Sequence, residues 1–468
     1  MTRAQRTVAT GRTVPTGHAM AAAEQAVAVL ERLPEVERAT YAGALRRMCD
    51  AVDRVEIVAA STDPGPVVSA FCAMGLIARI DRRDESSATG STRGGLPIHL
   101  HVCRPRRWGA ALLHHTGPPE HHLELQQIAR HLGYRLAEDG LFDAETTNMV
   151  DARTEEHIYR RLGLAYIPPT LRSGAGEIDA ALHDSVPTLV DCSNIRGDLH
   201  LHPDPALGLA PSARGHDQAI DGSDLWRGLV ETARASQYRY LALVDRYVAR
   251  SPTAWMTMPP DAPARPRPPP VDDSTIFVLR GLEVELGPDG SLECPSGTLD
   301  ECDVVIASIR SHLDQSPAAM TSRLVRACQN PRVNIINHRT GCLGSARPHL
   351  GFDREVVCEA AASTGTALEI TALGDRFGPS VEFGQHARGA GVLFSITTDA
   401  SSAVELSAMR FGVARAQRSW VGPKQVINTW PIAKLRRFLA KGRPVPDARY
   451  EHPRADLSGG GEVHAGAP

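Results

Sequence analysis

The sequence predicts an α/β protein of several domains, with a β/α barrel in its C-terminal half. The chain has 468 residues, enough for two to four domains, and 42% of them are hydrophobic, enough for buried cores. From about Asp191 onward, short apolar strands alternate with helical patterns, as they do in parallel β/α units. A smaller α/β unit comes first, and a mainly helical stretch separates it from the barrel.

The first 115 residues predict a small α/β unit that follows an unstructured start. Residues 1–18 are rich in Thr, Arg and Gly and lack an apolar segment, so we expect a disordered tail there. The unit is expected to span 19–115. Its hydrophobic patterns predict, in order, a helix, a strand, a helix and a strand, at 21–33, 55–60, 66–77 and 98–102.

Residues 116–190 predict a small, mainly helical domain and a linker. Helices are expected at 120–132 and 154–162. Pro168-Pro169 and the glycines at 174 and 176 then interrupt the pattern, as is typical of a connection between domains.

The barrel is expected to span 191–445, ahead of a Gly-rich disordered tail at 446–468. Seven prolines between 259 and 270 predict a loop over 251–271, because no helix continues through them. Helices are expected at 223–235, 320–328 and 354–363. The predicted strands are 198–202, 240–244, 277–284, 304–308, 333–336, 367–370 and 393–397.

Composition excludes some classes of function. The net charge is −3 and the pI is about 6.7, so tight nonspecific binding to duplex DNA has no overall electrostatic support. No apolar run is long enough to span a membrane. The nine cysteines contain no CxxC pair, and no secretory leader is evident. We therefore expect reduced thiols and a cytoplasmic protein.

The most informative motif is Asp198-Leu199-His200-Leu201-His202. Two histidines two positions apart on a strand point to the same face. Further polar residues follow the later strands, at the face where β/α barrels form their sites. Singly, each is more often structural; together they predict a metal-dependent hydrolase site. They are Arg246, Glu283, Arg310, His338 and Asp399.

Motifs along the chain resemble bacterial family X DNA polymerases that end in a PHP phosphoesterase domain. The N-terminal half contributes Ala42–Arg47, Trp108–Leu112 and Tyr166–Pro169. The C-terminal half contributes, in family order, runs at 196–202, 281–286, 305–308, 338–341, 367–370 and 409–413. The resemblance covers about 19–440. It implies a nucleotidyltransferase-like palm, a thumb-like domain, a distorted β/α barrel of the PHP type and a role related to DNA repair.

The resemblance also implies metal ligands in the barrel. The complete set for one ion falls on His200, His202, Glu283 and Asp399. A second ion would share Glu283 and His338, but its other histidine is Arg310 here. A third would lose its histidines to Arg246 and Ser401. Its Asp falls on Asp221 after an insertion, or on Leu207-Gly208 without one. We therefore expect one divalent ion, which would be Zn²⁺, Mn²⁺ or Fe.

The polymerase site departs further from the family pattern. The chain starts almost at the palm, without the family's helix-hairpin-helix domain. The three catalytic carboxylates fall on Arg54, Glu56 and His99. Because two-metal phosphoryl transfer needs bridging carboxylates, we expect neither Mg²⁺ at the palm nor templated synthesis. Glu56, His99 and His101 are either a stray metal site or, more commonly for such residues, solvated or structural.

Three functions remain open. The first is a one-metal phosphoesterase acting on a phosphate ester or a DNA 3′ end. In it Arg246 and Arg310 stabilise phosphate charge, Asp198 orients a ligand histidine and His338 is a general acid or base. The second is a pseudoenzyme that binds DNA, a nucleotide or a phosphorylated small molecule through a decayed site. The third is an active polymerase with 3′-5′ exonuclease activity. The sequence assigns no oligomeric state.

Overall fold

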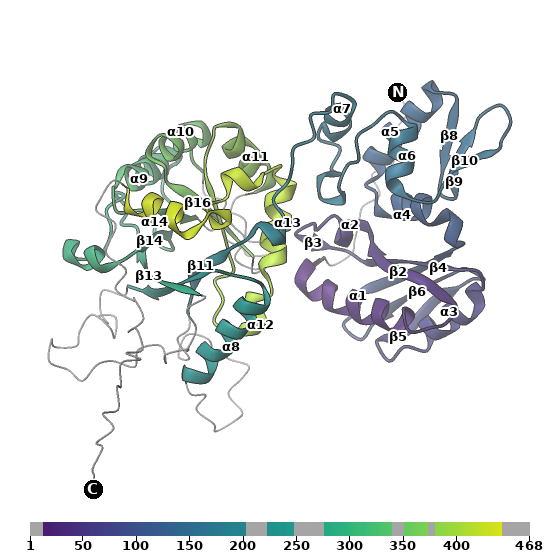
Figure 1. Cartoon of the computed structure of the whole chain (residues 1–468), viewed down its shortest axis with the longest axis horizontal. Helices are drawn as coiled ribbons and strands as arrows, with labels where there is room; N and C mark the ends of the chain where they lie inside the picture. The colour runs from purple at the N-terminus through teal and green to yellow at the C-terminus, as the bar shows by residue number, and fades with distance from the viewer. Residues whose placement is uncertain (1–12, 203–221, 248–275, 339–350, 373–379, 442–468) are drawn as a thin grey trace, which may run out of the picture.

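The computed structural model describes residues 13–202, 222–247, 276–338, 351–372 and 380–441 (Figure 1). Asp221, the proline-rich loop at 251–271 and the tail at 446–468 lie outside the described residues. The predicted tail at 1–18 is wrong at its end. Val14–Pro15 forms strand β1 and helix α1 spans Thr16–Leu30, so ordered structure starts before residue 19.

The N-terminal sheet has five strands in the order β2-β4-β7-β6-β5. Helices α1 and α3 (Pro64–Cys72) cover one face, and α4 (Trp108–Thr116) lies on the other (Figure 1). The short helix α2 (Gly43–Arg46) contributes Leu45 to the core under α1 and α3. A short pair, β1 with β3 (Ala51–Val52), lies beside α1. The strand bounds are Val36–Ala42 (β2), Val55–Ser61 (β4), Ile77–Arg83 (β5), Ser87–Thr92 (β6) and Pro97–Cys103 (β7).

Strand alternation divides the residues of this sheet between its two faces. Ile57 and Leu100 pack into the core under α1 and α3, whereas Val58 packs against α4. On β4, Glu56 lies two positions from Val58 and so shares its face, toward α4. On β7, His99 and His101 flank Leu100 and therefore also point to the α4 face. The predicted strands at 55–60 and 98–102 are confirmed, but β2, β5 and β6 were missed.

The middle region is less helical than predicted. Helices α5 (Pro119–His131) and α6 (Glu155–Arg161) are confirmed, and α7 (Glu177–Leu182) follows them. Between α5 and α6 lies an antiparallel sheet, in the order β10-β9-β8, that we did not predict. Its strands have only three or four residues, too few to show an alternating pattern. They are Tyr134–Ala137 (β8), Gly140–Asp143 (β9) and Met149–Asp151 (β10).

The C-terminal half contains seven parallel strands that neighbour one another in chain order, β11 to β17. A parallel bridge from Leu201 to Ala400 joins the first strand to the end of the last, so the barrel is nearly closed. The predicted strands are confirmed with small changes at their ends. Their bounds are Gly197–Leu201 (β11), Tyr240–Arg246 (β12), Phe277–Glu285 (β13), Val304–Ile309 (β14), Ile335–His338 (β15), Ala367–Thr371 (β16) and Phe394–Thr397 (β17).

Helices surround the barrel wall and share one apolar cluster with its outward side chains (Figure 1). Alternate residues, such as Tyr240, Ala242 and Val244, fill the interior, and α14 packs against this inner cluster. The helices are Gly222–Ala235 (α8), Pro317–Gln329 (α9), Arg354–Thr364 (α10), Val381–Gly389 (α11), Ala403–Leu406 (α12), Met409–Arg418 (α13) and Ile432–Ala440 (α14).

Helix α13 joins the barrel to the N-terminal half (Figure 1). The Arg415 and Arg418 guanidiniums lie 2.8 and 3.1 Å from Oδ1 of Asp50, and Arg410 pairs with Glu24 on α1. Phe411 packs against the apolar core under the N-terminal sheet. The two halves are therefore connected by both ionic and apolar contacts.

None of the helices in the described ranges is long and apolar enough to cross a membrane.

Candidate metal centre in the barrel

A β-bulge aims the two histidines of β11 into the barrel. The register with β12 runs Asp198↔Leu241 and then Leu201↔Leu243, so β11 has one extra residue between them. Leu199 consequently lies in the inner cluster, whereas Leu201 lies in the outer one. This reversal turns His200 and His202 toward the barrel interior. In a strand without the bulge, with Leu199 inside, both histidines would point outward.

The later strands add a carboxylate and a guanidinium to the same interior. On β13, Glu283 lies four positions after the inner residue Leu279 and therefore points into the barrel as well. On β12, Arg246 lies two positions after the inner residue Val244 and points the same way. Asp399 follows β17 with a left-handed φ of 52°. His200, His202, Glu283 and Asp399 are all at most 4% exposed, so the barrel brings the four predicted ligands together in a buried site.

The donor atoms of these four side chains converge. His200 Nε2 lies 3.0 Å from His202 Nε2, and His202 Nε2 lies 3.1 Å from Asp399 Oδ1. Oε2 of Glu283 is 3.8 and 3.5 Å from the two Nε2 atoms. Ligands around a tetrahedral ion with bonds of about 2.1 Å lie about 3.4 Å apart. The observed spacings bracket that value, so the residues fit one divalent ion.

Two arginines contact the same carboxylate. Arg246 Nε lies 3.0 Å from Oε2 of Glu283, and its Nη2 lies 3.7 Å from Asp399 Oδ1. Arg310 Nη2 pairs closely with Oε1 of Glu283, to which Ser308 also donates. The arginine side chains are 23% and 34% exposed, so they form the outer rim of a buried centre.

Partners outside the ligand set fix both imidazoles. Nδ1 of His200 lies 2.7 Å from Oε1 of Glu369, and Nδ1 of His202 lies 2.6 Å from the Val244 carbonyl. Such contacts at the second ring nitrogen leave Nε2 for a metal. The sequence predicts no role for Glu369, although the run 367–370 contributes to the resemblance. Its position just before the end of a barrel strand was the signal that could have identified it.

Asp198 contacts a predicted ligand histidine through the backbone. Its carboxylate accepts from the backbone N–H of His200 at 3.0 Å and from the N–H and hydroxyl of Thr398 at 3.0 and 2.6 Å. It therefore supports the bulge and ties β11 to β17, and Glu369 is the carboxylate that contacts the imidazole. Complete burial raises the pKa of Asp198 to about 7, against the hydrogen bonds that lower it.

Electrostatics favour a cation between these groups. Burial opposes charge on His200, but Glu369 and the neighbouring carboxylates raise its pKa well above the usual value. Burial likewise opposes ionisation of Glu283, but the histidines and Arg310 lower its pKa well below the usual value. A divalent ion held by these residues would displace the His200 proton and would add one net positive charge to the site.

Other predicted residues are only partly placed. The backbone puts His338 at the end of β15, opposite Ile309 in register, but its side chain is not among those described. Ser401 donates through its N–H and hydroxyl to Glu405 on α12. Asp221 lies outside the described residues. The third-ion set therefore gains no support from the described side chains.

The residues at which the resemblance places the polymerase carboxylates lie together on the N-terminal sheet. Glu56 on β4 is paired in register with His99 on β7, and Arg54 precedes β4. Oε1 of Glu56 lies 3.3 Å from His99 Nδ1, and its Oε2 lies 2.9 Å from His101 Nε2. Arg54 Nη2 pairs with Asp53 at 2.9 Å and its Nε is 3.9 Å from Glu56. Burial opposes ionisation of Glu56, but the two histidines lower its pKa to about 2.

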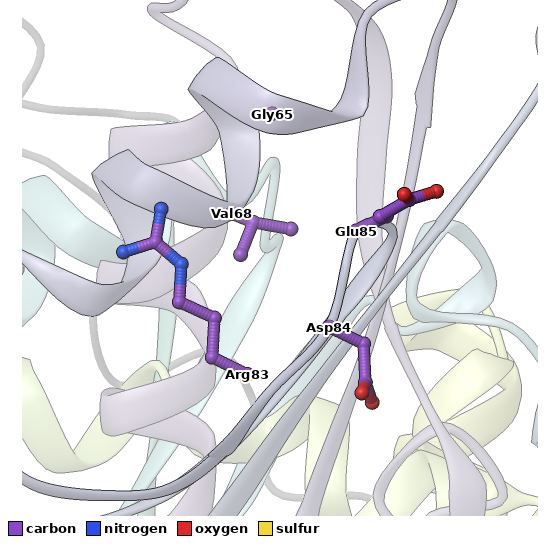
Figure 2. Close-up of a pocket in the computed structure, with 5 residues that line it drawn as sticks. All are labelled: Gly65, Val68, Arg83, Asp84 and Glu85. Carbon is purple, nitrogen blue, oxygen red and sulfur yellow. The ribbon is translucent and has the colours of Figure 1, made fainter.

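A hollow at the edge of the same sheet is unrelated to either cluster. It has a volume of about 490 Å³ and lies between α3 and the β5–β6 turn (Figure 2). Arg83 reaches from β5 toward α3, where it donates to Ser69 at 2.8 Å. The lining residues Gly65, Val68, Arg83, Asp84 and Glu85 include no histidine or cysteine.

Fold and site together define the class: a multidomain α/β protein whose nearly closed parallel barrel holds a buried cluster of metal-ligand type at its strand ends. A family model described as DNA polymerase beta thumb matches residues 111–173. Over 437 residues the chain is 28% identical to DNA polymerase/3′-5′ exonuclease PolX of Bacillus subtilis, which covers 91% of this chain and 73% of that protein.

Two further relatives match single regions. A probable phosphatase of Aliivibrio fischeri is 26% identical over 183 residues, which are 36% of this chain and 70% of that protein. Human DNA-directed DNA/RNA polymerase mu is 34% identical over 109 residues, 22% of this chain and 21% of its own length. The resemblance to bacterial family X DNA polymerases with a C-terminal phosphatase-like domain is thereby confirmed, and this chain is a divergent relative of them.

Proposed function

We propose that this protein is a metal-dependent phosphoesterase that uses one divalent ion in its barrel and no longer performs templated DNA synthesis. The observation that carries the proposal is the convergence of His200, His202, Glu283 and Asp399 beneath two arginines. In this proposal residues 19–115 are the palm, 116–190 the thumb-like domain and 191–445 a distorted PHP barrel. Its substrate is a phosphate ester, either a small molecule or a DNA 3′ end.

The four ligands would hold Zn²⁺, Mn²⁺ or Fe, which supplies Lewis-acid polarisation and lowers the pKa of water. Arg246 and Arg310 are positioned to bind the phosphate. Both guanidiniums are partly exposed and present planar donors that suit phosphate oxygens. As negative charge builds on those oxygens, the two arginines stabilise it. His338 is the last residue of β15, in register with Ile309 of β14, and we propose it as the proton donor or acceptor.

Loss of polymerisation follows from the N-terminal sheet. Arg54 occupies the place of a carboxylate, and a guanidinium has no acceptor atom with which to ligate Mg²⁺. Glu56, the remaining carboxylate, already pairs with His99 and His101. A primer-extension assay with Mn²⁺ tests this part of the proposal, and incorporation of a nucleotide would contradict it.

A second candidate is a protein that binds phosphate without hydrolysing it. The close pairing of Arg246 and Arg310 with Glu283 favours it, because guanidiniums on a ligand carboxylate replace the charge of absent cations. This candidate predicts that a phosphorylated ligand or DNA binds equally well before and after chelation. The phosphoesterase predicts that binding weakens when the ion is removed.

Glu283→Gln is the deciding variant, because the amide keeps the shape of the side chain and removes the negative charge that binds the ion. We expect it to abolish hydrolysis of chromogenic phosphate esters and of 3′-phosphorylated oligonucleotides. Glu293→Gln makes the same chemical change at an exposed position and should leave the rate unchanged. Equal turnover in wild type and Glu283→Gln would refute the assignment of the barrel as the catalytic site.

A further inference from the structure

A second cluster of metal-ligand type lies on the N-terminal sheet, outside the barrel. Glu56 on β4 and His99 and His101 on β7 share the face toward α4. One donor atom from each lies within 4.8 Å of the others. The three side chains are 17%, 23% and 28% exposed, so they are held by the sheet and remain accessible to solvent.

The donor set indicates which ions fit. Two imidazoles and one carboxylate are the three protein ligands of many catalytic Zn²⁺ sites and of non-haem Fe²⁺ sites, which leave further positions open. Mg²⁺ prefers oxygen ligands in octahedral geometry, and one carboxylate provides too few. We propose that Glu56, His99 and His101 form a second metal site, which binds one transition-metal ion of the Zn²⁺ class and does not bind Mg²⁺.

The neighbouring residues fix these ligands. The ring of His115 on α4 stacks on the ring of His101, with centroids 3.7 Å apart and planes at 23°. Nε2 of His115 lies 3.0 Å from Oε1 of Glu138. A Cβ at Gly43 would lie 3.0 Å from Cγ of Glu56, so glycine there leaves room for the carboxylate. These contacts hold His101 with its Nε2 directed at Glu56.

Charge around the cluster also permits a cation. Arg54 pairs more closely with Asp53 than with Glu56, at 2.9 against 3.9 Å. On the α4 side, Glu138 contacts His115 and lies 4.0 Å from His114. Two further carboxylates, Asp53 and Glu138, thus lie near the cluster and offset the charge of Arg54. The site does not depend on the proposed barrel chemistry, because none of its ligands comes from the barrel.

The test measures metal content of the full-length protein with its affinity tag removed. His202→Ala removes a barrel ligand, so the remaining Zn²⁺ reports on the second site. We expect His202→Ala to retain one equivalent of Zn²⁺ against a large excess of Mg²⁺, and His202→Ala with His101→Ala to retain none. Added Co²⁺ should give a visible absorption spectrum in the first protein and not in the second.

Controls separate metal loss from unfolding and from adventitious binding. His131→Ala on the His202→Ala background removes an exposed histidine elsewhere and should keep the ion. His99→Asn, a smaller change, should lose the ion and, with both proteins metal-free, keep the thermal unfolding midpoint of His202→Ala. Three results would overturn the proposal: no Zn²⁺ in His202→Ala, Zn²⁺ that persists in both palm variants, or displacement by Mg²⁺.

Discussion

The tripeptide His-Leu-His occurs twice in this chain, once on β7 and once on β11, and the two copies lie in different surroundings. In both, the central leucine, Leu100 or Leu201, packs toward the helices, and the flanking histidines point to the other face of their sheet. In the barrel that other face is the closed interior, and the histidines are at most 4% exposed. On the N-terminal sheet it is a face only partly covered by α4, and the side chains are 23% and 28% exposed.

The two copies show what the motif itself provides and what the surrounding side chains add. Each copy supplies two imidazoles beside one glutamate, which is Glu56 on β4 for the first copy and Glu283 on β13 for the second. Only the barrel adds an aspartate, Asp399, and a carboxylate behind one ring, Glu369. Only the barrel also places two guanidiniums on its glutamate. We therefore expect a tighter ion with phosphate-binding neighbours in the barrel, and a more accessible ion on the N-terminal sheet.

The largest predicted effect concerns stability in the N-terminal half. A buried carboxylate outside the histidine cluster, Glu155, is only 4% exposed, and its oxygens lie 2.6 Å from Arg172 and 2.7 Å from Arg46. Glu155→Gln leaves the buried Arg172 charge without its partner and should lower the free energy of unfolding by about 3–5 kcal/mol. Denaturant unfolding measures this. Barrel metal content should not change, and a variant as stable as wild type would contradict the prediction.

The same carboxylate sets a pH dependence. Burial opposes its ionisation, but Arg172 and Arg46 lower the pKa of Glu155 to about 2. Because the folded-state pKa lies below the unfolded value, the stabilisation is present above pH of about 4.5 and is lost as the pH falls toward about 2. Glu155→Gln should therefore show a smaller loss of stability than wild type across this interval.

An intermediate effect tests the outer contacts of the barrel centre. Glu369→Gln keeps a hydrogen-bond acceptor beside His200 but removes the negative charge of the carboxylate. The affinity of the barrel site for its metal should therefore fall by about 10–100-fold. Competition with a chromophoric chelator measures the affinity. The ion on the N-terminal sheet should be unaffected. Equal weakening of both ions would mean that the variant perturbs the whole fold, and the contrast between the two centres would then fail.

The smallest predicted effect concerns Arg54. Its side chain is 47% exposed and its Nε lies 3.9 Å from Glu56, so water screens most of its repulsion. Arg54→Ala should tighten Zn²⁺ at Glu56, His99 and His101 by up to about fivefold, the range of an exposed charge pair. Isothermal titration on the His202→Ala background measures it. Weaker binding in the variant would show that Arg54 supports the cluster.

Much of the fold could be predicted from local sequence patterns, and the errors of that prediction have physical causes. The barrel strands were predictable because buried parallel strands are continuous apolar runs. The sheet of β8, β9 and β10 was missed because its strands are too short to show a period. Helix α3 was predicted five residues too long at its C-terminal end because the apolar residues Met74, Leu76 and Ile77 continue its pattern into strand β5.

For the site, the sequence by itself determined the donors: an HxH pair on a strand, a glutamate and an aspartate after later strands, and arginines in place of two histidines. Tertiary structure decided which of them meet. The bulge at Asp198 turns His200 inward, and the nearly closed barrel brings Asp399 beside His202, 197 positions away in the chain. Contacts of this kind depend on the bulge and on barrel closure, which join residues far apart in the chain, and for that reason the contact of Glu369 with His200 emerged only from the fold.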